Sequence, residues 1–416
     1  MSATRDPDAA ARLARVAARR EAREGHAGAP ATPFAGRWGR ALVAAVAMLA
    51  ALTVAGLVLL WPGTVARTGP SQAMGGRTLG ATVLADATVP CAGPTRQACR
   101  RLTVRVDGGT RTGITTGPVA STSAMDAGAK IRVQHVAAPP GARNAEPYSL
   151  VGYDRRGALL WAAAIFAVLV VAITRARGVL ALVGLGLSLL VVTKFIVPAV
   201  LAGESGLLVA LVGALTVMFV TVLLTYGITG PSLAACLGIG VTLLIAAVGA
   251  AAFAHAAHLD GRSSELSTFL TGLDTHLSLS GVVLAGMVLA TLGVLADMGV
   301  TQASAVMALR HADPRSPAIE LYRRGFRVGR DHLVATTHTL VLVYVGATLP
   351  LLLVMSAAGV GVTDALDTQD LAEPILGTLI GAMALLISVP VTTALTAAVV
   401  AQMPAESFDG VHTHAH

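Results

Sequence analysis

The sequence contains eight long apolar runs, separated by shorter polar stretches. Each run is long enough to cross a hydrocarbon core of about 30 Å, which takes about 20 helical residues. The predicted transmembrane helices are 41–61, 157–174, 178–200, 206–227, 231–256, 280–309, 333–358 and 375–401. The pattern predicts an α-helical multipass integral membrane protein with about eight transmembrane helices.

Residues 62–156 have a different pattern, in which apolar and polar positions alternate. Leu102, Val104 and Val106 alternate with polar neighbours and are followed by an Asp-Gly-Gly turn, which is typical of a β-hairpin. "KIRVQHV" at 130–136 repeats the alternation. Several short strands in one short segment predict a small β-domain, either an OB-like barrel or a sandwich, between the first and second membrane helices.

These patterns divide the chain into five expected parts. The first run is too long for the apolar core of a signal peptide, so we expect it to remain as an anchor. The parts are an Arg/Ala-rich tail at 1–40, the anchor at 41–61, the β-domain at 62–156, a seven-helix transmembrane domain at 157–402 and a disordered tail at 403–416.

Composition and charge agree with this class. The chain is 54% hydrophobic and 13% charged, whereas a soluble domain has about 25% charged residues. Its net charge of +7 is spread over short segments beside the apolar runs, where basic residues set membrane orientation rather than bind nucleic acid. Segments 175–177 and 310–330 are basic and 359–374 is acidic, which predicts cytoplasmic termini and a β-domain outside the cytoplasm.

The sequence lacks the motifs of several enzyme classes. The chain has two lysines, Lys130 and Lys194, and neither follows a glycine, so a phosphate-binding P-loop is absent. The H-E-x-x-H motif of zinc proteases is absent as well. We therefore expect a protein that is not an enzyme and that needs no cofactor.

The cysteines fall into two groups. Cys91 and Cys99 lie in the polar segment and can form a disulfide if this segment is outside the cytoplasm; the alternative is two free thiols. Cys236 lies in an apolar run and is expected to be a small buried side chain.

The run 280–309 contains a carboxylate, Asp297. A charged group at membrane depth costs several kcal/mol unless it is neutralised, paired or hydrated. At 100° per residue, Thr301 and Ser304 share the face of Asp297, whereas Gln302 points away from it. These three residues form one candidate polar stripe.

The next run is preceded by "GRDH" and adds three candidates. Asp331 and His338 share one face, and His332 lies on a neighbouring stripe. A short connection makes the two helices antiparallel neighbours, which would let Asp297 approach His338. Such a pair can exchange a proton near neutral pH or bind a cation of unknown identity. The alternative is that these polar groups only hold helices together.

Two stretches carry a family resemblance. "GVLADMGVTQASAVMALR" at 293–310 and "VGRDHLVATTHTLVLVYVGATLPLLL" at 328–353 resemble the YibE/F-like family of bacterial multipass membrane proteins. The resemblance extends from about Gly157 to Gln402, and the anchor with its β-domain is similar to YibE-type members. It implies the bacterial cytoplasmic membrane and a permease-like activity without a named substrate. Where the family has an acidic pair, this chain has Ala296-Asp297.

The expected function is that of a secondary transporter or permease for an unknown small solute or ion. Asp297, Thr301, Ser304 and His338 would line its pathway, with Asp331 and His332 at the cytoplasmic mouth. The alternative is a membrane scaffold whose β-domain docks another envelope protein; an intramembrane enzyme would need a motif that this sequence lacks. Besides the lipid bilayer, the partners left open are a second copy of the chain and an envelope protein.

Overall fold

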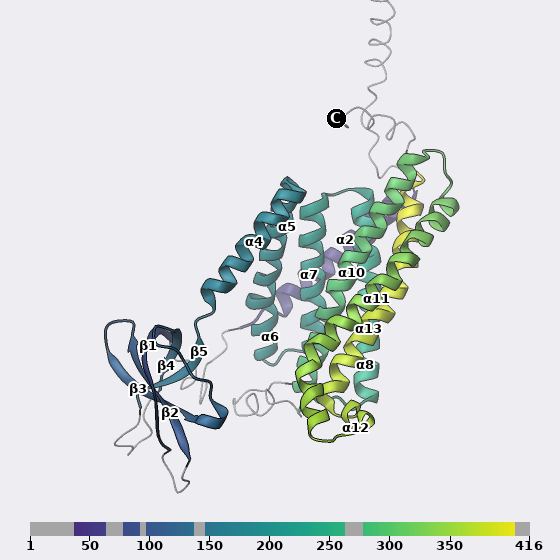
Figure 1. Cartoon of the computed structure of the whole chain (residues 1–416). Coiled ribbons are helices and arrows are strands. Elements are labelled where there is room, and N and C mark those ends of the chain that lie inside the picture. Colours follow the sequence, from purple (N-terminus) through teal and green to yellow (C-terminus); the bar gives the residue numbers. More distant parts are fainter. Residues whose placement is uncertain (1–36, 64–77, 92–96, 137–145, 263–277, 404–416) are drawn as a thin grey trace, which may run out of the picture. The chain divides into compact units, whose positions relative to one another are not determined.

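The computed structural model describes residues 37–63, 78–91, 97–136, 146–262 and 278–403 (Figure 1). Nearly all of the tails expected at 1–40 and 403–416 lies outside these residues. The chain divides into two compact units, and each is described by itself. The helical unit comprises the chain up to Leu60, Leu207–Leu259 and the chain from Val282 onward, and the mixed unit comprises Trp61–Gly206 and Asp260–Gly281.

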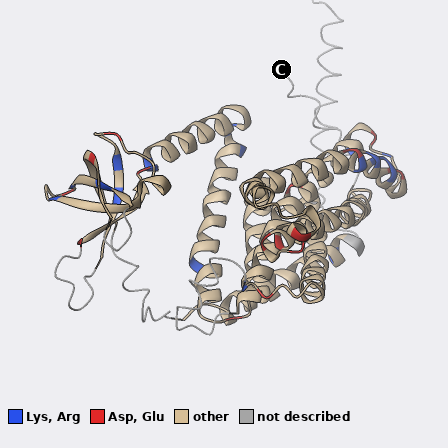
Figure 2. Cartoon of the chain, turned by 60° about the horizontal axis from the view of Figure 1, so that its bottom comes forward, with Lys and Arg blue, Asp and Glu red and all other residues tan. Residues whose placement is uncertain are grey.

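The described residues contain eight helices that are long and apolar enough to cross a membrane. Most of their length carries no charged residue (Figure 2). They are α2 (Arg37–Leu59), α4 (Arg156–Thr174), α5 (Ala176–Val191) with its continuation α6 (Val197–Leu201), α7 (Gly206–Tyr226), α8 (Gly230–Ala256), α10 (Leu279–Ala312), α11 (Ala318–Ala357) and α13 (Gln369–Val400). A π-helical turn, Val192–Ile196, joins α5 to α6, and the short helix α12 (Val362–Leu366) precedes α13. The number and approximate positions of the predicted long apolar helices are thereby confirmed.

The basic segment 310–330 differs from the loop expected there. Helix α10 continues to Ala312 and α11 begins at Ala318, so only residues 313–317 join them. Arginine is a good helix former, so a run of arginines ends the apolar pattern without ending the helix. Arg324 also donates to Glu320 one turn earlier, at 2.6 Å, which supports the first turns of α11.

The mixed unit contains a five-stranded antiparallel sheet. Its strands are β1 (Thr78–Pro90), β2 (Ala98–Val106), β3 (Arg111–Pro118), β4 (Lys130–His135) and β5 (Tyr148–Tyr153), in the order β3-β2-β1-β4-β5. The predicted hairpin is confirmed: β2 and β3 are joined at Asp107–Thr110, where Gly108 and Gly109 have φ angles of 108° and 92°. Positive φ angles favour glycine, which explains the Gly-Gly pair in this turn.

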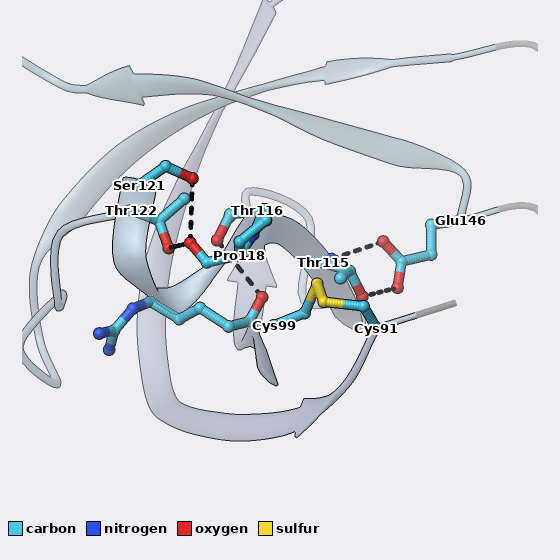
Figure 3. The surroundings of a disulfide bond; sticks show 9 residues. Cys91, Cys99, Thr115, Thr116, Pro118, Ser121, Thr122 and Glu146 are labelled. Atoms are coloured by element: carbon cyan, nitrogen blue, oxygen red, sulfur yellow. Dashed lines mark hydrogen bonds between the residues drawn. A yellow bond between two sulfur atoms is a disulfide. The ribbon is translucent and has the colours of Figure 1, made fainter. Parts of the chain in front are cut away.

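The sheet is curled around its own small core. Alternate residues of β1, β2, β3 and β4 are buried, as the alternating sequence pattern requires. Thr115 of β3 donates from its backbone N and its Oγ1 to the carboxylate of Glu146, which lies just before β5, so the two edge strands come close to each other. Near this contact, at the start of β2, a disulfide joins Cys91 to Cys99 (Figure 3). The core residues are Ala81, Val83, Leu102, Val104, Val106, Ile114, Ile131 and Val133.

The core of the helical unit is built around small residues on α8. A buried small residue recurs at every fourth position of this helix: Ala234, Gly238, Thr242, Ala246, Ala250 and Ala254. The facing helix α13 has Ala384, Ser388, Thr392 and Thr396 at the same spacing, also buried. Small side chains let helix backbones approach closely, and a Cβ atom on Gly238 would collide with Thr392. Close packing of α8 against α13 thus positions the helices that surround them.

Candidate functional site

One cross-section of the helical unit can be followed through contacts at three glycines. A Cβ atom placed on Gly240 of α8 would lie 2.6 Å from Leu49 of α2 and 3.7 Å from Leu215 of α7. A Cβ atom on Gly299 of α10 would lie 2.5 Å from Ile239, the neighbour of Gly240. These close approaches place α2, α7, α8 and α10 at one level.

The same level crosses α11 and α13. A Cβ atom on Gly329 of α11 would lie 2.7 Å from Val389 of α13 and 2.5 Å from Oε1 of Gln302 on α10. We call this cross-section the middle layer, defined by Leu49, Leu215, Gly240, Gly299, Gly329 and Val389. Leu49 and Leu215 lie near the centres of α2 and α7, whose 23 and 21 residues match the length needed to cross a bilayer. The middle layer is therefore half-way along the two shortest membrane-length helices of this unit.

Asp297 lies two residues from Gly299 and therefore close to the middle layer. Its side chain is exposed, as are those of Thr301 and Ser304 one and two turns further along. The structure thus brings the three predicted residues together on one face of α10. Among the described residues, no hydrogen bond or ion pair joins Asp297 to another side chain.

The exposed face of α10 has an unusual composition. We call it the open face of α10, and it consists of Gly286, Gly293, Asp297, Thr301, Ser304 and Ala308. No large apolar side chain is exposed anywhere on the described residues of α10. By contrast, α11 exposes Val334, Leu342 and Val343 by 59%, 68% and 68%. The open face of α10 therefore differs from a surface built to contact lipid tails.

Gln302 lies on the opposite face and fixes how α10 meets α11. It is 1% exposed, and its Nε2 donates to the carbonyl oxygen of Gly325 at 2.7 Å. Gly325 and Gly329 leave room for this side chain. The antiparallel register of the two helices is thereby set by one buried hydrogen bond.

This register locates the three candidates on α11. With Gln302 beside Gly325 and Gly329, Asp297 is level with Asp331 and His332. His338 is about six residues further along, or about 10 Å at 1.5 Å per residue, so the register does not place it opposite Asp297. All three candidates on α11 are exposed.

Asp331 and His332 lie at a different height from the one expected for them. The sequence predicts the mouth of the pathway, yet they are two and three residues after Gly329 and so lie close to the middle layer. The reason is that α11 begins at Ala318 and has three turns before it reaches them. Sequence reasoning placed the helix start too late and so moved these residues toward its end.

Two groups of buried polar residues were missed. Ser388, Thr392 and Thr396 recur at every fourth position of α13 and are completely buried, and their hydroxyls have no hydrogen-bond partner among the described residues. Their spacing in "SVPVTTALT" was the available signal. Because Thr392 packs directly on Gly238, they belong to the α8–α13 contact.

Arg310 is the second missed group. It is 5% exposed and donates to the carbonyl oxygens of Ser316, Ala401 and Met403 at 2.7, 3.2 and 3.3 Å. It thereby fastens the α10–α11 connection to the end of α13. In the same connection, the Ser316 hydroxyl donates to Asp313 and holds the pKa of that carboxyl below its usual range.

The described residues contain no group of three or more His, Cys, Asp or Glu side chains placed to hold a metal ion. The open face of α10 presents the carboxylate of Asp297 and the hydroxyls of Thr301 and Ser304. On α11, a second carboxylate and an imidazole, those of Asp331 and His332, lie at the height of Asp297. These groups can take up protons or bind solutes through hydrogen bonds.

The fold and this set of residues define a multipass membrane protein with an added small β-sheet. A model of the YibE/F-like protein family matches residues 162–402, more than half of the chain. The chain belongs to the YibE/F-like family, which confirms the resemblance seen in the sequence. The matched region includes all of α10, α11 and α13. Neither the curated proteins nor the solved structures gave a match.

Proposed function

We propose that this protein is a secondary transporter or permease of the bacterial cytoplasmic membrane. The open face of α10 lines its pathway, and Asp297 is the group that takes up and releases a proton or a cation. One observation carries the proposal: a carboxylate exposed near the middle layer, on a helix face of small and polar residues.

The energetic argument concerns what covers that face. A carboxylate in contact with lipid tails near the bilayer centre costs several kcal/mol. Lipid-facing helix surfaces are instead built from large apolar side chains, such as those that α11 exposes. The open face of α10 is therefore covered by water or by polar groups, and a hydrated pathway supplies both access and solvation.

The height of the carboxylate fits transport chemistry. Secondary transporters bind substrates and coupling ions near the bilayer midplane, often beside interrupted helices. Pro390 adjoins Val389 of the middle layer and lacks the N–H that would bond to the carbonyl of Leu386. We infer that α13 bends at this level during transport and that Asp331 and His332, which are level with Asp297, line the same pathway.

The orientation proposed for the membrane is the one predicted from the sequence. Both termini and the arginine-rich α10–α11 connection face the cytoplasm, and the sheet lies outside it. Arginine near short connections favours the cytoplasmic side. A disulfide between Cys91 and Cys99 accords with an oxidising compartment for the sheet.

We also propose that the sheet is an OB-like barrel. It has the five antiparallel strands and the curl that such a barrel needs, and the Thr115–Glu146 contact brings its edges together. Its surface is the part of this protein suited to contact an envelope protein. That role adds to transport and does not replace it.

The test is a flux measurement in proteoliposomes with an imposed pH gradient. Internal pH is followed with a trapped dye while a panel of solutes and ions is added. We expect a solute-dependent proton flux in the wild type and at least a tenfold loss in Asp297→Asn. Asp367→Asn, which removes an exposed acid between α12 and α13, is the matched control and keeps the flux.

Two results would overturn the proposal. One is full flux in Asp297→Asn, because the carboxylate would then have no part in transport. The other is an absence of flux across the whole panel, combined with loss of a cellular phenotype only when residues 78–153 are deleted. The second result supports a scaffold.

A further inference from the structure

The outer face of the β2–β3 hairpin carries three arginines at neighbouring positions. Arg105 of β2 lies directly opposite Arg111 of β3, and Thr103, the next outward residue of β2, lies opposite Gly113. Arg101 is the outward residue after Thr103. We call Arg101, Arg105 and Arg111 the arginine cluster. All three are exposed, whereas the residues between them on β2 are buried in the core of the sheet.

Gly113 brings the side chain of Arg101 close to the other two arginines. A Cβ atom on Gly113 would lie 2.7 Å from Nε and 2.9 Å from Nη2 of Arg101, so the guanidinium lies against this glycine. Gly113 is two residues from Arg111, which is about 7 Å along a strand. A glycine inside a strand weakens it and often marks a place where another group approaches closely. Arg101 therefore reaches across the hairpin toward Arg111.

The opposed pair of arginines is unfavourable by itself. Directly opposite residues of an antiparallel pair have Cβ atoms about 5 Å apart, and like charges at such positions destabilise a sheet. Within the described part of the chain, the structure gives no ion pair to Arg105 or Arg111. Arg101 has a long contact with Glu146, at 3.9 Å, and that carboxylate also accepts two hydrogen bonds from Thr115.

The charges around the cluster do not balance it. Asp107 is exposed near the end of the hairpin, and its carboxylate lies over Gly80 of β1. On the same face, Lys130 of β4 is opposite Thr82, and Thr82 is opposite Arg105. Among the described residues of this face, basic side chains therefore outnumber carboxylates. The excess positive charge can be offset by an anion at the cluster.

We propose that the arginine cluster binds a phosphate group. A guanidinium donates paired hydrogen bonds in a planar fork that matches the oxygens of a phosphate. A phosphate has more free oxygens than a carboxylate and can carry two charges, so it can serve three converging arginines. The exposed hydroxyl of Thr103, between Arg101 and Arg105, can donate a further hydrogen bond.

The group has two sources that share this chemistry, soluble organic phosphates and the headgroups of anionic phospholipids. The cluster lies entirely on the sheet, so the proposal does not rest on transport by the helices.

The test uses the full-length chain, purified in an uncharged detergent and titrated with glycerol 3-phosphate or with acetate at constant ionic strength. Binding is followed by isothermal titration calorimetry. We expect the Kd of the wild type for glycerol 3-phosphate to be at least tenfold lower than for acetate. Arg105→Gln/Arg111→Gln should raise that Kd at least tenfold. Arg105→Lys/Arg111→Lys should raise it less, because an ammonium group keeps the charge and loses the fork.

Gly113→Ala tests the geometry of the cluster without changing its charge. The added methyl group displaces the guanidinium of Arg101, so the Kd for glycerol 3-phosphate should rise at least threefold. The apparent Tm should not fall, because alanine is no less favourable than glycine inside a strand. Lys130→Gln/Arg155→Gln is the matched charge control: both residues are exposed and lie outside the cluster, and this variant should keep the wild-type affinity.

A lipid titration distinguishes the two sources of phosphate. Native mass spectrometry counts phosphatidylglycerol and phosphatidylcholine molecules of the same acyl chains on the wild type and on Arg105→Gln/Arg111→Gln. Fewer bound phosphatidylglycerol molecules on the variant assign the cluster to a lipid headgroup. Unchanged lipid binding, with loss of glycerol 3-phosphate, assigns it to a soluble phosphate.

Four results would overturn the proposal. The first is binding of both phosphate compounds that is unchanged in Arg105→Gln/Arg111→Gln. The second is an equal loss of affinity in the Lys130→Gln/Arg155→Gln control, which would show general charge attraction. The third is binding of acetate as tight as that of glycerol 3-phosphate, and the fourth is wild-type affinity in Gly113→Ala.

Discussion

Residues five positions apart on α10 have opposite roles. Asp297 faces outward and is paired with none of the described residues, whereas Gln302 is buried and bonded to α11. The helical period alone predicts that they point in different directions. It does not predict which carbonyl Gln302 finds, because that depends on how deeply α11 is inserted beside α10. For this reason the stripe of Asp297, Thr301 and Ser304 was predictable, whereas the height of His338 relative to it was not.

Gln302→Leu is expected to lower the stability of the helical unit. The variant removes a buried hydrogen bond to the carbonyl of Gly325, which keeps its bond within α11, and the loss is worth about 0.5–1.5 kcal/mol. The measurement is the apparent Tm of the purified protein in detergent. Gln402→Leu is the control, because Gln402 is exposed and donates only within its own helix end. Equal Tm values for the two variants would contradict the role given to Gln302.

Arg310→Gln is expected to loosen the end of the bundle where α10, α11 and α13 meet. It removes charge-assisted hydrogen bonds to three carbonyl groups, worth about 1.5–3 kcal/mol for a typical bond of this kind. Limited proteolysis at residues 313–317 should become faster than in the wild type. Arg315→Gln, at an exposed position in the same connection, should leave the rate unchanged. If both variants are cut at the same rate, Arg310 does not fasten this end.

At the scale of elements, the lengths of the apolar runs predicted the helices but did not predict the residues at which they begin and end. Hydropathy reports where a helix is apolar, whereas a helix ends where its backbone bonding ends. Helix α11 therefore begins at Ala318, 15 residues before the apolar run expected at 333, because arginines and Glu320 continue the helix. The buried hydroxyls of α13 were missed for a related reason. Serine and threonine in apolar helices are common, and only the facing small residues of α8 show that these are buried.

Gly238→Val tests the close packing of α8 and α13. The added side chain would collide with Thr392, so folded yield and Tm should both fall. Gly249→Val is the control on the same helix, because a Cβ atom at Gly249 meets nothing within 4 Å. Both variants lose helical glycine and gain a β-branched residue, so only their surroundings differ. A fall of the same size in both would show that packing at Gly238 is not special.

At the scale of the whole chain, the sequence predicted two kinds of structure correctly. The alternating segment forms a curled five-stranded sheet, and the apolar runs form eight membrane-length helices. Periodicity and length are local properties, so a single sequence reveals them. The middle layer is not local, since it depends on contacts among six helices. The contacts of this layer place Asp297 about half-way along α2 and α7, the two shortest membrane-length helices of the unit.

The central claim is that water reaches the open face of α10. The most direct measurement is the labelling of Thr301→Cys by a membrane-impermeant thiol reagent, in membranes carrying a Cys236→Ala background with the Cys91–Cys99 disulfide intact. Leu342→Cys, on the apolar exposed surface of α11, is the control. We predict rapid labelling of Thr301→Cys and almost none of Leu342→Cys. Labelling of Thr301→Cys as slow as that of Leu342→Cys would contradict a hydrated pathway along α10.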